Sequence, residues 1–314
     1  HALSQIEAWQ SNGLTLPISI NVGGRQLLHG DFTQRLRDAL GRHPSVSPNQ
    51  LEIEVLETSA LEDLVRVSQI INECQAIGVS FALDDFGTGY SSLTYLKRLS
   101  VNQLKIDQSF VRDMLDDPDD LSILGGVLNM ATAFRRQVLA EGVETVAHGA
   151  MLLQLGCELA QGYGIARPMP ADDIPAWIAS WRPNEAWSSM HAASRDDLPL
   201  LFAGVEHRAW VTAVEDFLEN RRSTLPLAHH QCRFSAWLDD EGRALHQDRP
   251  SFTAILELHR ELHLLASRLC SGGMTQTAEA RQAGLDHLHA LRDALLEQLQ
   301  TLIAENRTLD ANRH

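Results

Sequence analysis

One repeated pattern constrains the fold more than any other feature of this sequence. Between residues 16 and 162, short apolar runs end in a polar residue and are followed by a turn and an amphipathic helical stretch. The apolar runs are residues 17–20, 51–55, 79–83, 103–106, 137–140 and 157–160. Strands that alternate with helices at this spacing are typical of βα units with a parallel sheet. The sequence therefore predicts an α/β domain of the TIM-barrel type, with six βα units visible.

The predicted barrel is incomplete within this sequence. A closed parallel barrel has about eight strands, so we expect roughly two more upstream of His1. The chain opens inside a helical stretch, residues 3–9, and without an initiator methionine. We therefore expect the natural N-terminus and the first strands of the barrel to be absent from this chain.

Polar side chains stand at or just beyond the end of each apolar run. They are Asn21, Glu54, Asp84 with Asp85, Lys105, Glu141 and Gln161. In a parallel barrel these positions converge on the C-terminal face, where the active sites of this fold are built. A single polar residue after a strand is usually a turn or cap residue. A succession of them, mostly of metal-ligand or phosphate-binding types, indicates a site.

The segment DDFGTGYSSL, residues 84–93, favours a metal centre. Its adjacent carboxylates, Asp84 and Asp85, repel each other unless cations lie between them, which favours two metal ions about 3.5 to 4 Å apart. Oxygen ligands favour Mg²⁺ or Mn²⁺ over zinc. Asn21 and Glu54 add further oxygens, and Lys105 offers a compact positive charge for a phosphate oxygen or the attacking water.

Net charge and cysteine content argue against several kinds of partner and location. A formal net charge of -15 argues against a nucleic-acid polymer as the partner, because proteins that bind one usually carry a basic patch. No apolar stretch approaches the roughly 20 residues of a membrane-spanning helix, so we expect no membrane segment in this chain. The four cysteines are too few and too scattered for a disulfide framework, which favours a reducing, cytoplasmic location.

The sequence changes character after residue 181. Residues 182–198 are rich in Pro, Asn, Ser, Ala and charged residues without apolar periodicity, which indicates a linker. Residues 199–306 show no strand-like alternation and carry leucines at helical spacing, at positions 285, 288, 291, 295, 299 and 302. We therefore predict a partial barrel domain over residues 1–181 and an all-α helical bundle over residues 199–306.

Several motifs of the barrel half resemble one family. They are DDFGTGYSSL at 84–93, YLKRL at 95–99 with LKID at 104–107, EGVET at 141–145, QGYGIARP at 161–168, INVGGRQL at 20–27 and LEIEVLETSAL at 51–61. In content, order and spacing they are similar to the EAL domain family of cyclic-di-GMP phosphodiesterases, over residues 1–180. The resemblance implies hydrolysis of cyclic-di-GMP to linear pGpG by a centre that holds two Mg²⁺ or Mn²⁺ ions.

The resemblance also implies which residues hold the two metal ions. Asn21, Glu54 and Asp84 would bind the first ion. Asp84 and Asp85 would bind the second, with Glu141 as a further ligand or as a general base.

Three further residues take roles by the same resemblance. Lys105 would hold the nucleophilic water or a phosphate oxygen, Glu57 would brace the loop that follows the two aspartates, and Gln161 would line the substrate site. Two departures from the family pattern, Gly23 in place of Ser and Ser100 in place of Pro, do not touch the metal ligands.

A more serious departure concerns the motif that names the family. No EAL tripeptide occurs before Asn21, whereas in the family its Glu lies on the second strand and binds the first metal. We therefore expect this chain alone to be inactive or nearly so, although the retained ligands favour an active parent enzyme. The alternative is an inactive EAL domain that binds cyclic-di-GMP as a receptor. A third reading assigns the role in the cell to the helical half alone, as a zinc-responsive dimerisation unit.

Four residues of the helical half form a candidate zinc site. His259 and His263 are one helical turn apart, and the segments HRAW and CRFSAW supply His207 and Cys232. Three His and one Cys suit tetrahedral zinc. The HxxW, CxFxxW and HxxxH blocks resemble the chemoreceptor zinc-binding domain, with Ser235 in place of the usual Gly, and the resemblance implies one Zn²⁺ on these four residues. A zinc-bound thiolate can report zinc or oxidants, and bundles of this kind can pair as homodimers.

Overall fold

The chain divides into two compact units. The computed structural model describes residues 1–89, 93–188, 190–224, 232–272 and 277–311, so residues 90–92 of the DDFGTGYSSL motif lie outside the described residues. One unit comprises residues 1–113 with 122–192, and the other comprises residues 114–121 with 193–314. The piece 114–121 thus belongs to the second unit although its sequence neighbours on both sides belong to the first.

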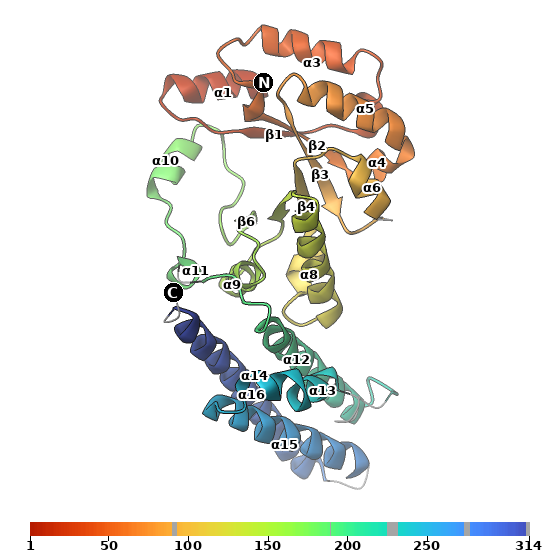
Figure 1. Cartoon of the computed structure of the whole chain (residues 1–314), viewed down its shortest axis with the longest axis vertical. Helices are drawn as coiled ribbons and strands as arrows, with labels where there is room; N and C mark the ends of the chain where they lie inside the picture. The colour runs from red at the N-terminus through yellow and green to blue at the C-terminus, as the bar shows by residue number, and fades with distance from the viewer. Residues whose placement is uncertain (90–92, 189, 225–231, 273–276, 312–314) are drawn as a thin grey trace. The chain divides into compact units, whose positions relative to one another are not determined.

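The first unit is built on a parallel sheet of six strands in sequential order (Figure 1). The strands are β1 (Ile18–Asn21), β2 (Leu51–Leu56), β3 (Ser80–Phe86), β4 (Gln103–Ile106), β5 (Gln137–Ala140) and β6 (Leu159–Ala160). All six predicted apolar runs contain strand residues. Together with the helices between them, they confirm the predicted α/β class as a partial parallel barrel. Within the described residues, β1 and β6 form the two edges of the sheet.

Helices connect these strands. They are α1 (Ala2–Ser11), α2 (Gly24–Leu27), α3 (Phe32–Gly41), α4 (Glu57–Glu62), α5 (Leu64–Gln75), α6 (Leu93–Arg98), α7 (Gln108–Asp113), α8 (Pro118–Ala133) and α9 (Val146–Gln154), with a 3₁₀ turn η1 (Pro48–Gln50) before β2. After β6 follow α10 (Ile174–Ser180) and α11 (Glu185–Ser188). In α3 the buried residues Phe32, Leu36 and Leu40 recur every fourth position, so this helix turns one apolar stripe to the core.

The strand register brings the polar strand ends side by side. Asn21 pairs with Glu54 across β1 and β2, and Leu56 pairs with Asp84 across β2 and β3. The register of β3 against β4 is irregular at Asp84 and Asp85. Such an irregularity re-aims side chains at the end of a strand, which matters for two successive carboxylates.

The second unit is helical (Figure 1). Its helices enclose a leucine-rich core. Its helices are α12 (Leu198–Leu218), α13 (Arg233–Asp239), α14 (Glu241–His246), α15 (Pro250–Gly272) and α16 (Ala278–Ala311). The leucine stripe that the sequence predicts is buried, at Leu285, Leu288, Leu291, Leu295, Leu299 and Leu302 of α16. The prediction of an all-α second half is confirmed. Among the described helices, none is both long and apolar enough to cross a membrane.

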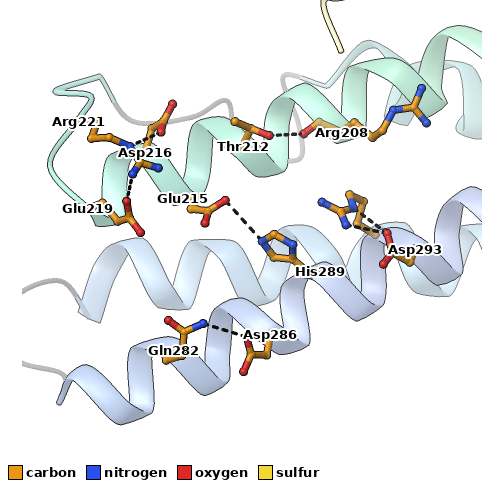
Figure 2. A network of polar contacts seen from close by, with 11 residues as sticks. Arg208, Thr212, Glu215, Asp216, Glu219, Arg221, Gln282, Asp286, His289 and Asp293 are labelled. Atoms are coloured by element: carbon orange, nitrogen blue, oxygen red, sulfur yellow. Dashed lines mark hydrogen bonds and ion pairs between the residues drawn. The ribbon is translucent and has the colours of Figure 1, made fainter. Parts of the chain in front are cut away.

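A network of polar contacts lies along α12 and α16 (Figure 2). Glu215 of α12 lies 3.6 Å from His289 of α16, and Arg221 contacts Asp216 at 2.7 Å and also Glu219. These side chains are partly exposed, and exposed ion pairs contribute only about 0 to 1 kcal/mol each. The stability of the second unit therefore depends mainly on its apolar core.

The predicted linker, residues 182–198, contains regular structure. Helix α11 lies within it, and α12 begins at its last residue. Near its end, Asp197 accepts hydrogen bonds from Ser194 Oγ at 2.7 Å and from Asn306 Nδ2 at 2.6 Å. The start of α12 is thereby tied to the C-terminal part of α16.

Candidate active site and zinc site

Lys105 lies buried among three carboxylates. Its Nζ lies 2.9 Å from Glu54 Oε2, 2.7 Å from Asp84 Oδ1 and 2.7 Å from Glu141 Oε1. The four residues come from β2, β3, β4 and the position after β5, so neighbouring strands build the cluster. Burial alone would lower the pKa of Lys105, but hydrogen bonds to the carboxylates outweigh it and raise this pKa above its ordinary value. Lys105 therefore carries a positive charge within the cluster.

Asp84, Asp85 and Glu141 bring their oxygens close together. One carboxylate oxygen from each lies within 4.8 Å of the others. Burial raises the pKa of Asp85, and the charges of Asp84 and Asp107 add to the effect. Burial also raises the pKa of Glu141. Since burial and like charge disfavour the ionised carboxylates, a cation bound between them would stabilise the ionised forms.

The donor set fits divalent metal ions. Glu54, Asp84, Asp85 and Glu141 supply four carboxylates, against the one ammonium group of Lys105 that contacts three of them. An excess of negative charge on oxygen ligands favours Mg²⁺ or Mn²⁺. On the neighbouring strand, the exposed Asn21 ends β1 opposite Glu54 and adds an amide oxygen to the same edge of the sheet.

Backbone strain accompanies this site. Asp85 has a φ angle of 55°, a left-handed conformation that is uncommon for residues other than glycine. Such conformations persist where the surrounding structure enforces them, and they cluster at functional sites. The strained position coincides with the second of the two adjacent carboxylates.

Glu57 begins α4 and contacts the loop that follows β3. Its side chain is buried, and its Oε2 accepts a hydrogen bond from the backbone N–H of Gly87 at 3.0 Å. Gly87 has a φ angle of 104°, which glycine adopts without the steric cost of a side chain. The carboxylate of Glu57 thus holds the backbone two residues after Asp85.

Gln161 joins the cluster from the other end of the sheet. Its Nε2 donates a hydrogen bond to Glu141 Oε1 at 2.9 Å. Both residues line a pocket of about 660 Å³ together with Tyr163, Arg167 and Trp177. The guanidinium carbon of Arg167 lies 4.9 Å from the ring centroid of Tyr163, a cation–π arrangement. The pocket therefore combines aromatic and cationic walls with the carboxylate edge of the cluster.

Asp107, the last residue of the LKID motif, lies close to the cluster, although the sequence patterns assign it no role. Its charge and a hydrogen bond contribute to the raised pKa of Asp85. Its own Oδ1 accepts a hydrogen bond from the backbone N–H of Ser109 at 2.9 Å. The available signal is its position directly after the apolar run of β4, two residues beyond Lys105.

The second unit brings the four predicted zinc ligands together. One ligand atom from each of His207, Cys232, His259 and His263 lies within 4.8 Å of the others. Cys232 Sγ lies 3.9 Å from His207 Nε2 and 3.6 Å from His259 Nε2. A tetrahedral zinc ion with ordinary bond lengths separates sulfur from nitrogen by about 3.6 Å. The cluster therefore has the donor types and the spacing of a zinc site.

The surroundings of this cluster orient its ligands. The Nδ1–H of His207 donates to the carbonyl of Ala203 at 2.7 Å, so Nε2, the nitrogen nearer to Cys232, carries the lone pair. The ring of Trp210 lies 4.2 Å from that of His263, centroid to centroid. All three histidines are buried, whereas Cys232 is only partly buried and borders a pocket of about 440 Å³. The sulfur is thus the ligand most open to other molecules.

Comparison with protein-family models identifies the family of the first unit. Residues 1–168, more than half of the chain, match the model of the EAL domain. The chain belongs to the EAL domain family. Residues 207–270 of this EAL protein match the chemoreceptor zinc-binding domain, a range that contains all four residues of the buried cluster.

Known relatives resemble the EAL part. The bifunctional diguanylate cyclase/cyclic di-GMP phosphodiesterase MucR of Pseudomonas aeruginosa is 38% identical over 179 residues, which cover 57% of this chain and 26% of MucR. The solved MucR phosphodiesterase, a c-di-GMP complex, gives a TM-score of 0.53 at 38% identity, with 55% of this chain and 70% of that chain covered. The EAL domain of Mycobacterium smegmatis DcpA gives a TM-score of 0.55 at 33% identity, and the match covers 58% of this chain and 82% of that chain. The chain thus spans about a quarter of the length of its curated relative MucR.

Proposed function

We propose that this EAL protein is a metal-dependent phosphodiesterase that hydrolyses cyclic-di-GMP to pGpG. The observation that carries the proposal is the cluster of Glu54, Asp84, Asp85 and Glu141 around the buried Lys105 at the carboxyl ends of the strands. Its relative MucR, which is 38% identical over 179 residues, is named a bifunctional diguanylate cyclase/cyclic di-GMP phosphodiesterase.

Two groups of side chains would hold two Mg²⁺ or Mn²⁺ ions. Asn21, Glu54 and Asp84 would bind the first, and Asp84, Asp85 and Glu141 the second. Such ions would offset the negative charge of the phosphodiester and make water a better nucleophile.

The remaining groups would act on the substrate directly. Lys105, kept protonated by its carboxylate partners, would donate hydrogen bonds to a phosphate oxygen or to the attacking water. As water attacks phosphorus, the P–O bond to the ribose 3′ oxygen breaks, and that oxygen takes up a proton. Glu141 would accept the proton of the water if it is not itself a metal ligand. Gln161 would orient Glu141 and contact the substrate, while Glu57 would hold the loop after Asp85 in place.

The second unit would regulate this activity. We propose that His207, Cys232, His259 and His263 bind one Zn²⁺, and that zinc occupancy or oxidation of Cys232 changes the rate of hydrolysis. The partly buried sulfur of Cys232, which borders the pocket, supports access by an oxidant. The described cysteines are all free, which suits the reducing cytoplasm. We also propose that the protein forms a homodimer through its helical unit.

Two features of the chain as printed favour a receptor role. The chain contains no EAL tripeptide before Asn21, and its sheet has two open edges, at β1 and β6, within the described residues. The polypeptide 1–314 would then bind cyclic-di-GMP without hydrolysing it.

We therefore expect residues 1–314 alone to show less than about 1% of the turnover of a form completed to the full eight-stranded barrel, because a first-metal ligand is missing. Chromatography of the nucleotides in Mg²⁺ or Mn²⁺ measures pGpG directly. Comparable turnover by the two forms would mean that another residue replaces the missing Glu. No pGpG from the completed form would contradict the phosphodiesterase proposal and favour the receptor.

A further inference from the structure

Helix α11 contacts α9, and Trp187 is part of this contact. Trp187 of α11 donates a hydrogen bond from Nε1 to the backbone carbonyl of Val146, the first residue of α9, at 2.8 Å. These residues belong to the first unit, but α11 lies after the EAL match and before the zinc-binding match, which end and begin at residues 168 and 207. Neither family therefore accounts for this contact.

Gly149 of α9 leaves room for the indole of Trp187. A Cβ at Gly149 would lie 2.6 Å from atoms of the Trp187 indole, which is closer than real Cβ atoms come. Apart from proline, glycine is the least favourable residue inside a helix, so its presence in the middle of α9 needs a reason. The close approach of the indole supplies that reason.

The anchored end of α9 adjoins the loop that carries Glu141. Only four residues separate Glu141 from Val146. The loop is held by a hydrogen bond from Val143 N–H to the Gln161 carbonyl at 3.0 Å and by Thr145, whose hydroxyl caps α9 by accepting from His148 N–H at 3.1 Å. A shift of the first turn of α9 would therefore be transmitted to this short, hydrogen-bonded loop.

Glu141 itself is sensitive to such a shift. Its Oε1 accepts from both Lys105 Nζ at 2.7 Å and Gln161 Nε2 at 2.9 Å. Hydrogen bonds weaken steeply with poor geometry, so a small displacement of the backbone would alter both.

We propose that α11, through Trp187, positions the loop that carries Glu141, and that this contact transmits the zinc state of the second unit to the active site. The proposal rests on the proposed function and deepens it. The second unit resumes at residue 193, so only four residues connect it to the end of α11, and a change in that unit would reach α11 through this short covalent connection. Trp187 is a positioning residue, because it acts through α9 and the loop.

Hydrogen exchange on residues 1–314 tests the positioning without any need for activity. In Trp187→Ala and in Gly149→Ala, which forces the indole away, the amide of Val143 should exchange about 10-fold faster than in the wild type. Trp187→Phe, which keeps the ring but loses the hydrogen bond, should give a smaller effect and guards against misfolding. The matched control is Gly126→Ala in α8, where an added Cβ meets nothing within 4 Å, and it should leave Val143 unchanged.

Zinc provides the second arm of the test. Adding zinc to chelator-treated wild type should change the exchange of Val143, and the change should be lost in Trp187→Ala while zinc still binds. Unchanged exchange in both Trp187→Ala and Gly149→Ala would overturn the positioning role. A zinc response that persists in Trp187→Ala would overturn the transmission.

Kinetics of the form with a complete barrel give a readout that general destabilisation would not reproduce. Trp187→Ala should lower kcat about 10-fold and raise the Mn²⁺ concentration needed for half-maximal rate, because displacement of Glu141 would weaken the metal site. An equal loss at saturating and limiting Mn²⁺ would contradict a role through Glu141. If the wild type hydrolyses nothing, the proposed function fails while the exchange experiment still decides the positioning.

Discussion

Asp84→Asn should abolish cyclic-di-GMP hydrolysis in a form of the protein that carries the complete EAL barrel, with a loss larger than about 100-fold. Losing even an indirect partner of a metal ligand typically lowers metal affinity or activity about 10- to 100-fold, and Asp84 would touch both metal ions. The amide keeps the size of the side chain but removes the charge that now faces Lys105 at 2.7 Å. Glu54→Gln should give a loss of the same order, because it removes a ligand of the first ion.

The matched control for Asp84→Asn is Asp38→Asn. Asp38 lies exposed on α3, where its carboxylate accepts a hydrogen bond from Gln34. Surface substitutions of this kind change stability by at most about 0.5 kcal/mol, so activity should stay within a factor of about 2. Chromatographic quantification of pGpG at saturating Mn²⁺ measures all three variants. Retained hydrolysis in both Asp84→Asn and Glu54→Gln would contradict the two-metal assignment.

The architecture of the first unit is predictable because each strand leaves a local mark in the sequence. Strands β4 and β5 coincide with the predicted runs 103–106 and 137–140, since the strands of a parallel sheet covered by helices are mostly apolar. The boundaries of the other strands differ from the predicted runs by one to three residues. Strand β3 extends to Phe86, through Asp84 and Asp85, although the apolar run ends at residue 83. Asp84 and Asp85 therefore lie inside β3, beyond the run that the sequence predicts, and both contribute to the site.

Contacts between distant residues account for what the sequence does not show. Nothing in the residue types predicts that Lys105 contacts Glu54, Asp84 and Glu141 at once, because this depends on the register of four strands. The same holds for Trp187, whose segment reads as a polar linker although its indole packs on Gly149. A segment that forms part of a core shows a periodic pattern of apolar residues. A single partly buried aromatic residue in an otherwise polar segment, such as Trp187, produces no such pattern.

The zinc site is predictable from the sequence only in part. The spacing of His259 and His263 follows from the helix alone, one turn apart on the same face. The approach of Cys232 to His207 and His259 depends on how α12, α13 and α15 pack, which the sequence supports only through its resemblance to a known domain. Burial of all three histidines separates this cluster from the exposed histidine pairs that are common on helices.

Cys232→Ala should lower the zinc affinity of residues 1–314 at least about 100-fold and lower the melting temperature of the helical unit by about 10 °C or more. A ligand at about 1,000 times its Kd adds about 4 kcal/mol to the free energy of unfolding, and a 100-fold weaker site loses about 2.7 kcal/mol of that. In a unit of this size each kcal/mol shifts the melting temperature by about 4 °C or more. Elemental analysis after washing with a weak chelator measures zinc content, and calorimetry with and without zinc measures the shift.

The matched control is Cys270→Ala, which removes the other partly buried thiol of the helical unit. Cys270 lies on α15, packs against the apolar core and is absent from the His207, Cys232, His259 and His263 cluster. Its loss should leave the zinc content near one per chain and lower the melting temperature equally with and without zinc, because only packing is removed. The decisive quantity is the zinc-dependent part of the shift, which should nearly vanish in Cys232→Ala and persist in Cys270→Ala. Equal zinc content in the wild type and Cys232→Ala would exclude the sulfur as a ligand and contradict the proposed site.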